Sequence, residues 1–233
     1  MRKHPVVARV AKVARFLGDL KDRVVFVGGS VVPFLVPTVV APTIRMTDDV
    51  DCVVQATTTV QYYALSDLLR DCGFQECTDH GAPICRWTVD GIRVDVMPDG
   101  ESALGFRNRW YEQVLLDPIT VEVESGLQIR IVSPVTFLAT KFEAMADRGH
   151  GDYMGNTDFE DIVTVMAYRD DIFDLVSLAT QEVRLYLSEQ AEHLQTLINL
   201  PELVSGCLPP DPVSQETVSE VLALLHHLAK ENR

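Results

Sequence analysis

Strand-forming patterns are confined to the first 132 of the 233 residues. The β-branched and aromatic run Val24–Val27 ends in two glycines and predicts a buried strand with a tight turn. The Asp90-Gly91 pair separates two apolar segments, which is the strongest short-range signal for a β-hairpin, and Ser125-Gly126 marks a second candidate. From Ser133 onward the patterns are helical. We therefore expect an α+β chain with two parts.

Composition favours a soluble protein of a reducing compartment. No apolar run approaches the roughly 18 residues of a membrane span, and the basic N-terminus lacks the apolar stretch of a signal peptide. The odd number of cysteines and the absence of CxxC pairs disfavour a disulfide framework or a zinc site and indicate the cytoplasm. The formal net charge of -14 argues against broad nucleic-acid binding, which depends on Lys and Arg neutralising phosphates.

Three aspartates are the candidate catalytic and metal-binding residues. Asp49 and Asp51 are two apart on a predicted strand, so their side chains project from the same face. Asp95 lies on the second arm of the hairpin expected at Asp90-Gly91. If the two strands pair, three carboxylates meet on one surface, where they can bind one or two hard cations such as Mg²⁺. Each aspartate taken alone is more typical of a solvated strand residue.

The turn Gly28-Gly29-Ser30 is a candidate phosphate-binding element. It follows a predicted strand and precedes a predicted helix start, and glycine lets the backbone approach a phosphate closely. No GK[ST] sequence follows, so the turn is not a Walker A loop, and it is not a GxGxxG fingerprint. An ordinary strand-to-helix turn is the structural alternative.

These motifs, in this order, resemble the polymerase-β-like nucleotidyltransferases. The matching segments are Val27 to Ser30, Arg45 to Asp51 and Val94 to Val96. The Arg-x-Thr-x-Asp-x-Asp form looks most like the AbiE-type toxin branch, which includes the MenT-like transferases. This resemblance implies that Arg45 and Thr47 bind the nucleotide. The resemblance implies a catalytic core at residues 1–132, a mixed sheet flanked by helices, and a helical C-terminal domain at 133–233 that completes the nucleotide pocket.

That branch also carries a lysine on a later helix and an aspartate beyond it. Here Lys141 is the candidate lysine, with a catalytic and a nucleotide-binding role, and Arg148 is a second candidate for nucleotide binding. Both lie on or beside the apolar stripe of a predicted helix, and two cations directed inward there would suit a triphosphate. Thr157-x-x-Glu160 reads as a capping box that begins the next helix. Asp158 flanks the stripe of that helix and Asp161 points away from it. The sequence does not decide between them, so both are candidates for the nucleotide-binding aspartate of that branch.

The resemblance implies transfer of a nucleoside monophosphate from a nucleoside triphosphate to an acceptor hydroxyl, with Mg²⁺ or Mn²⁺ as cofactor. The expected acceptor is a tRNA 3′ end in a toxin–antitoxin or phage-defence setting, with a cognate antitoxin as a possible partner. The acidity of the chain would match a cationic, aminoglycoside-like acceptor better. A protein hydroxyl is a third acceptor, and a non-catalytic nucleotide-binding module is the remaining alternative. No membrane partner is expected.

Overall fold

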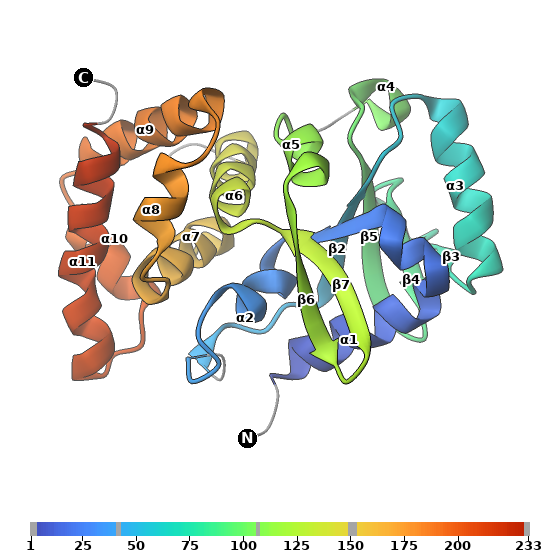
Figure 1. The fold of residues 1–233 in the computed structure, drawn as a ribbon, viewed down its shortest axis with the longest axis horizontal. Helices are drawn as coiled ribbons and strands as arrows, with labels where there is room; N and C mark the ends of the chain where they lie inside the picture. Colours follow the sequence, from blue (N-terminus) through green and yellow to red (C-terminus); the bar gives the residue numbers. More distant parts are fainter. Residues whose placement is uncertain (1–3, 41–42, 106–107, 149–152, 231–233) are drawn as a thin grey trace. The chain divides into compact units, whose positions relative to one another are not determined.

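The computed structural model describes residues 4–40, 43–105, 108–148 and 153–230 (Figure 1). The chain divides into two compact units. The first comprises Met1–Phe34 and Arg45–Ser133, and the second comprises Leu35–Ile44 and Pro134–Arg233. Among the described residues, no helix combines the length and the apolar character needed to cross a lipid bilayer.

The first unit is built on a seven-stranded sheet of strand order β3-β4-β5-β2-β1-β7-β6. Its central strands are nearly all buried apolar residues, as β-branched runs in the middle of a sheet should be. The strands of the described residues are β1 Val24–Val27, β2 Asp49–Val54, β3 Gln75–Glu76, β4 Arg86–Val89, β5 Ile92–Pro98, β6 Pro118–Glu124 and β7 Leu127–Val132.

The sheet is mixed. Strand β2 pairs antiparallel with β1 and parallel with β5, while β1 pairs parallel with β7. Both expected hairpins are present, β4–β5 and β6–β7. Asp90 and Gly91 both have positive φ angles, 48° and 75°, as the tight two-residue turn requires. The α+β prediction, with a mixed sheet flanked by helices, is confirmed.

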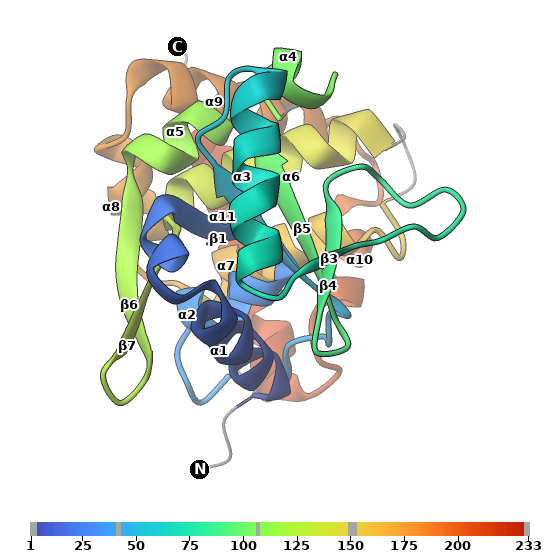
Figure 2. The same ribbon diagram turned by 90° about the vertical axis from the view of Figure 1, so that its right-hand side faces the viewer.

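Helices cover the sheet of the first unit. Helix α3 lies over the sheet (Figure 2). Its Tyr62 hydroxyl donates to the Val96 carbonyl of β5 at 2.9 Å. Strand side chains alternate between the two faces, so Val94 and Val96 lie on the side opposite to Asp95. The helices of this unit include α1 Pro5–Leu17, α3 Thr59–Asp71, α4 Glu101–Leu104 and α5 Tyr111–Leu116, with short 3₁₀ turns η1 Gly18–Arg23 and η2 Gly29–Val31. Helix α2, Val32–Leu35, ends at the division between the units.

The secondary-structure elements that the structure describes between residues 134 and 230, in the second unit, are all helices. The segment Leu35–Ile44 belongs to it, and Arg169 Nη1 donates to the Leu35 carbonyl at 2.9 Å. Its helices are α6 Pro134–Arg148, α7 Thr157–Tyr168, α8 Ile172–Ser177, α9 Gln181–Gln195, α10 Leu200–Cys207 and α11 Pro212–Leu228 (yellow to red in Figure 1).

Helix α7 begins at Thr157, where the sequence predicted a helix start, but its capping residue differs from the prediction. The cap is Asn156, whose side-chain oxygen accepts from the backbone N–H groups of Asp158 and Phe159 at 2.9 and 3.1 Å. The prediction of a capping box at Thr157 and Glu160 was therefore wrong. Asn and Thr are both good caps, and an Asn one residue earlier satisfies two backbone donors at once.

Candidate functional site

The three candidate aspartates converge on one face of the sheet. Asp51 and Asp95 are direct register partners on the parallel strands β2 and β5. Asp49 lies two residues before Asp51, on the same face. One carboxylate oxygen from each residue can be chosen so that all three lie within 4.8 Å of one another. We call Asp49, Asp51 and Asp95 the carboxylate triad.

The triad has the donor chemistry of a divalent-cation site. Three hard oxygen ligands converge, and like charges held this close repel unless a positive charge offsets them. Mg²⁺ and Mn²⁺ both accept carboxylate oxygens and leave coordination positions for water and phosphate. The residues present therefore fit a hard divalent cation such as Mg²⁺ or Mn²⁺.

The Gly28-Gly29-Ser30 turn lies beside the triad. Strand β1 is antiparallel to β2, and Val27 is the register partner of Asp51. Gly28 has a φ of 69° and a ψ of -167°, a region that only glycine adopts readily. The Ser30 hydroxyl is fully buried and donates to the Val27 carbonyl at 3.2 Å. In this structure the hydroxyl holds the turn against the end of β1.

Thr47 and Arg45 precede the triad strand. Thr47 is buried, and its hydroxyl donates to the carbonyl of Asp49 at 3.1 Å. Its own carbonyl accepts from the Arg9 guanidinium of α1. Arg45 is half-buried at the start of this segment. Thr47 thus fixes the backbone from which Asp49 projects.

Arg86 is a part of the site that the sequence reasoning missed. It lies opposite Asp95 in the β4–β5 hairpin and donates a hydrogen bond to each oxygen of that carboxylate. The distances are 2.8 Å from Nε to Oδ1 and 2.7 Å from Nη2 to Oδ2. These hydrogen bonds raise the pKa of the Arg86 guanidinium, against the opposing effect of its partial burial. The signal was in the sequence, because a two-residue turn at Asp90-Gly91 places residue 86 opposite residue 95.

Lys141 forms a buried ion cluster in the second unit. Its ammonium lies 2.9 Å from Asp158 Oδ1 and 2.7 Å from Asp161 Oδ2, and all three side chains are at least 90% buried. Burial opposes the charged lysine, but the two aspartates outweigh it and raise its pKa. The structure thus brings Lys141 together with both aspartates between which the sequence did not decide. Asp161 is 1% exposed, although the helical pattern places it away from the apolar stripe.

Arg148 is the last residue of α6. Its side chain lies outside the described part of the structure, so its expected contact with a triphosphate stays a prediction.

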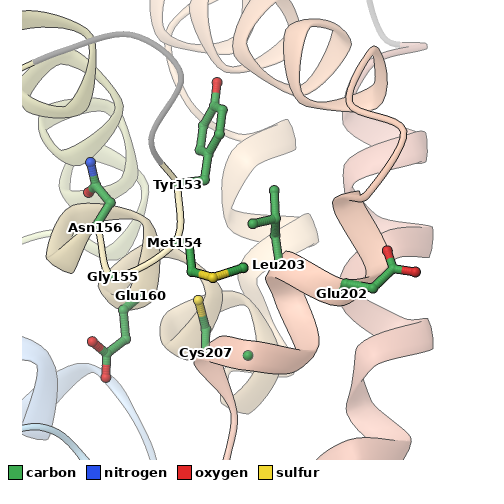
Figure 3. Close-up of a pocket in the computed structure, with 9 residues that line it drawn as sticks. Tyr153, Met154, Gly155, Asn156, Glu160, Glu202, Leu203 and Cys207 are labelled. Carbon is green, nitrogen blue, oxygen red and sulfur yellow. The ribbon is translucent and has the colours of Figure 1, made fainter.

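A separate cavity of about 350 Å³ lies between the start of α7 and α10. Met154, Leu203 and Cys207 meet at its centre, and Tyr153 closes one side (Figure 3). The carboxylates of Glu160 and Glu202 lie at opposite margins and point apart (Figure 3). Burial, and secondarily Glu160, raise the pKa of Cys207 to about 12. None of the candidate site residues lines this cavity.

The chain matches no family model and no curated protein. Its fold is similar to the crystal structure of an antigenic nucleotidyltransferase-like protein from Paracoccidioides brasiliensis, with a TM-score of 0.52 and 20% sequence identity over 86% of this chain and 92% of that one. A second similar structure, JHP933 from Helicobacter pylori, has a TM-score of 0.48 and 12% identity over 98% and 91% of the two chains. The first of these similarities shows that the chain shares its fold with that nucleotidyltransferase-like protein.

Proposed function

We propose that this protein is a divalent-metal-dependent nucleotidyltransferase. The observation that carries the proposal is the convergence of Asp49, Asp51 and Asp95 on adjacent strands of a nucleotidyltransferase-like fold. A lone acidic pair would be weak evidence. A third carboxylate in direct register across a parallel strand pair, next to a glycine turn, is much more specific.

In the proposed reaction an acceptor hydroxyl oxygen bonds to the α-phosphorus of a nucleoside triphosphate. The bond between that phosphorus and the bridging oxygen breaks, and pyrophosphate leaves with the bonding electrons. Asp49 and Asp51 would hold the cation, Mg²⁺ or Mn²⁺, and Asp95 would complete the site and take up the hydroxyl proton. A bound cation supplies charge neutralisation on the phosphate oxygens. Most of the rate would come from positioning and electrostatics.

The remaining candidates have supporting roles in this proposal. The backbone of Gly28 and Gly29 would approach the phosphates, with Ser30 holding the turn in shape. Arg45 and Thr47 are our candidates for contacting the nucleotide, and Thr47 would also order the segment before the triad. Lys141 uses two of the three donors of an ammonium on Asp158 and Asp161, and with Arg148 it is our candidate for offsetting triphosphate charge.

We propose a tRNA 3′ end as the acceptor, because the order of the motifs resembles that of the AbiE-type and MenT-like transferases. The same resemblance implies a cytoplasmic enzyme in a toxin–antitoxin or phage-defence setting, with a cognate antitoxin as partner. One observation favours a second acceptor class. The net charge of -14 would attract a cationic, aminoglycoside-like molecule and repel a polyanion. Binding of tRNA should weaken steeply as salt rises, because phosphate contacts release counterions.

The test is transfer from each α-³²P-labelled nucleoside triphosphate, with Mg²⁺, into total tRNA, into an aminoglycoside panel and into the protein itself. Label in tRNA that disappears with Asp51→Ala supports the first acceptor and identifies the base. Label only in the aminoglycosides supports the second, and label in the protein indicates a protein hydroxyl. If the protein binds nucleotide but releases no pyrophosphate with any acceptor, it is a nucleotide-binding module and not an enzyme.

A further inference from the structure

The Arg86–Asp95 pair is built into the sheet. The two residues face each other across the β4–β5 ladder, and their side chains are 23% and 12% exposed. A planar guanidinium that donates two parallel hydrogen bonds to one carboxylate fixes the orientation of that carboxylate as well as offsetting its charge. Lysine, a point charge on a flexible stem, offsets the charge of a carboxylate but does not fix its orientation.

Arg86 also places a positive charge in direct contact with the triad. Three carboxylates carry three negative charges, and the guanidinium offsets one of them. A carboxylate has about four lone-pair positions, so Asp95 can accept two N–H bonds and still offer an oxygen lone pair to a cation. Arg86 and a cation therefore share Asp95, and each lowers the attraction of the triad for the other.

We propose that Arg86 is the protein's own counter-ion for the carboxylate triad and the positioning residue for Asp95. It stabilises the cation-free site, holds Asp95 in the orientation that transfer needs, and lowers the affinity for the divalent cation. This rests on the proposed function only through its effect on transfer. The effects on cation affinity and on stability do not require that the protein be an enzyme.

The experiment compares Arg86→Met, Arg86→Gln and Arg86→Lys with the unaltered chain. Mn²⁺ affinity is measured from the electron paramagnetic resonance signal of the free ion, and the unfolding temperature is measured in EDTA and in Mn²⁺. Asp51→Asn locates the binding, because it removes a triad charge. Arg15→Met is the matched control, since it removes an equal charge from α1, where Arg15 pairs with Glu124.

We expect Arg86→Met and Arg86→Gln to unfold at a lower temperature in EDTA and to bind Mn²⁺ on the order of tenfold more tightly, because a positive charge beside the cation is gone. Arg86→Lys should stay near the unaltered chain in both measurements but transfer nucleotide more slowly. A purely structural arginine would not raise cation affinity on removal. Arg15→Met should change Mn²⁺ affinity less than about twofold, since exposed charges are well screened.

Two results separate the failure of this inference from failure of the proposed function. If the unaltered chain binds Mn²⁺ and Asp51→Asn does not, yet Arg86→Met and Arg86→Gln bind with unchanged or weaker affinity, the counter-ion role is wrong. Full transfer by Arg86→Lys would overturn the positioning role. If the unaltered chain binds no Mn²⁺, or binds it as well as Asp51→Asn does, the triad is not a cation site, and the inference and the proposed function fail together.

Discussion

The carboxylate of Asp51 occupies the space in which a side chain on Gly28 would stand. A Cβ at position 28 would lie 2.9 Å from Asp51 Cγ and would overlap its Oδ2. The glycine of the turn therefore does more than permit a positive φ. It lets the Asp51 carboxylate lie over the end of β1, where β1 and β2 pair.

Gly28→Ala should consequently weaken cation binding as well as stability. The backbone conformation alone costs about 1–3 kcal/mol for a residue with a Cβ. The Asp51 carboxylate must also leave its position beside Asp49 and Asp95 to make room for the new Cβ. Isothermal titration with Mn²⁺ and urea unfolding measure the two effects. Gly126→Ala is the control, because Gly126 also has a positive φ, 77°, but its Cβ would meet nothing within 4 Å. Equal Mn²⁺ affinity in both variants would contradict the prediction.

The sequence predicted the local parts of this site well, because the signals are short-range. A two-residue turn at Asp90-Gly91 sets the β4–β5 register, and Asp49 and Asp51 share a face through strand alternation. The sequence did not predict that β2 pairs with β5, and the meeting of the three carboxylates was expected only if these strands paired. Strands far apart in the chain carry no local signal of which strand they pair with. Arg86 was missed for another reason. The turn gave its position, but its partner was read only as a metal ligand.

The helical half shows the limit of reading side chains by helical period. Asp161 lies off the apolar stripe of α7 and yet is buried, and Lys141 from α6 offsets its charge there. A stripe describes where apolar side chains pack and says nothing of a buried ion pair formed with another helix. The inclusion of Leu35–Ile44 in the second unit is likewise a long-range feature that no local pattern indicates.

Asp51→Asn and Asp95→Asn should separate stability from activity. Each removes one negative charge from the triad without a change of shape, so Asp51→Asn relieves repulsion and should raise the unfolding temperature in EDTA, by about 2–4 °C for each kcal/mol. Asp95→Asn also weakens the Arg86 ion pair and should gain less or lose stability. Both should lower nucleotide transfer by about 100-fold or more, as does loss of one preorganised electrostatic group. Retained full transfer in either variant would remove that residue from the site.

Cys207 should contribute to instability in alkaline solution. Burial, with a smaller effect of Glu160, raises the pKa of its thiol from 9.0 to about 12. The folded state holds the proton more tightly than the unfolded state, so this contribution is complete below pH 9 and is lost as pH rises toward 12. The urea midpoint should therefore fall less between pH 8 and pH 10 in Cys207→Ala than in the unaltered chain. An equal fall in both would show that other groups account for the alkaline effect.

Lys141→Met should be among the most damaging single changes in the helical unit. It leaves Asp158 and Asp161 buried without their shared cation, and breaking such a buried pair costs about 3–5 kcal/mol. The triple variant Lys141→Met, Asp158→Asn, Asp161→Asn should recover much of that stability, because it buries no net charge. Urea unfolding of the single and triple variants measures both effects. The raised pKa of Lys141 means that its stabilisation persists through neutral pH and is lost only as pH rises above 10.5. If the triple variant regains stability but not nucleotide transfer, the cluster takes part in transfer, and if it regains both, Lys141 is a structural residue.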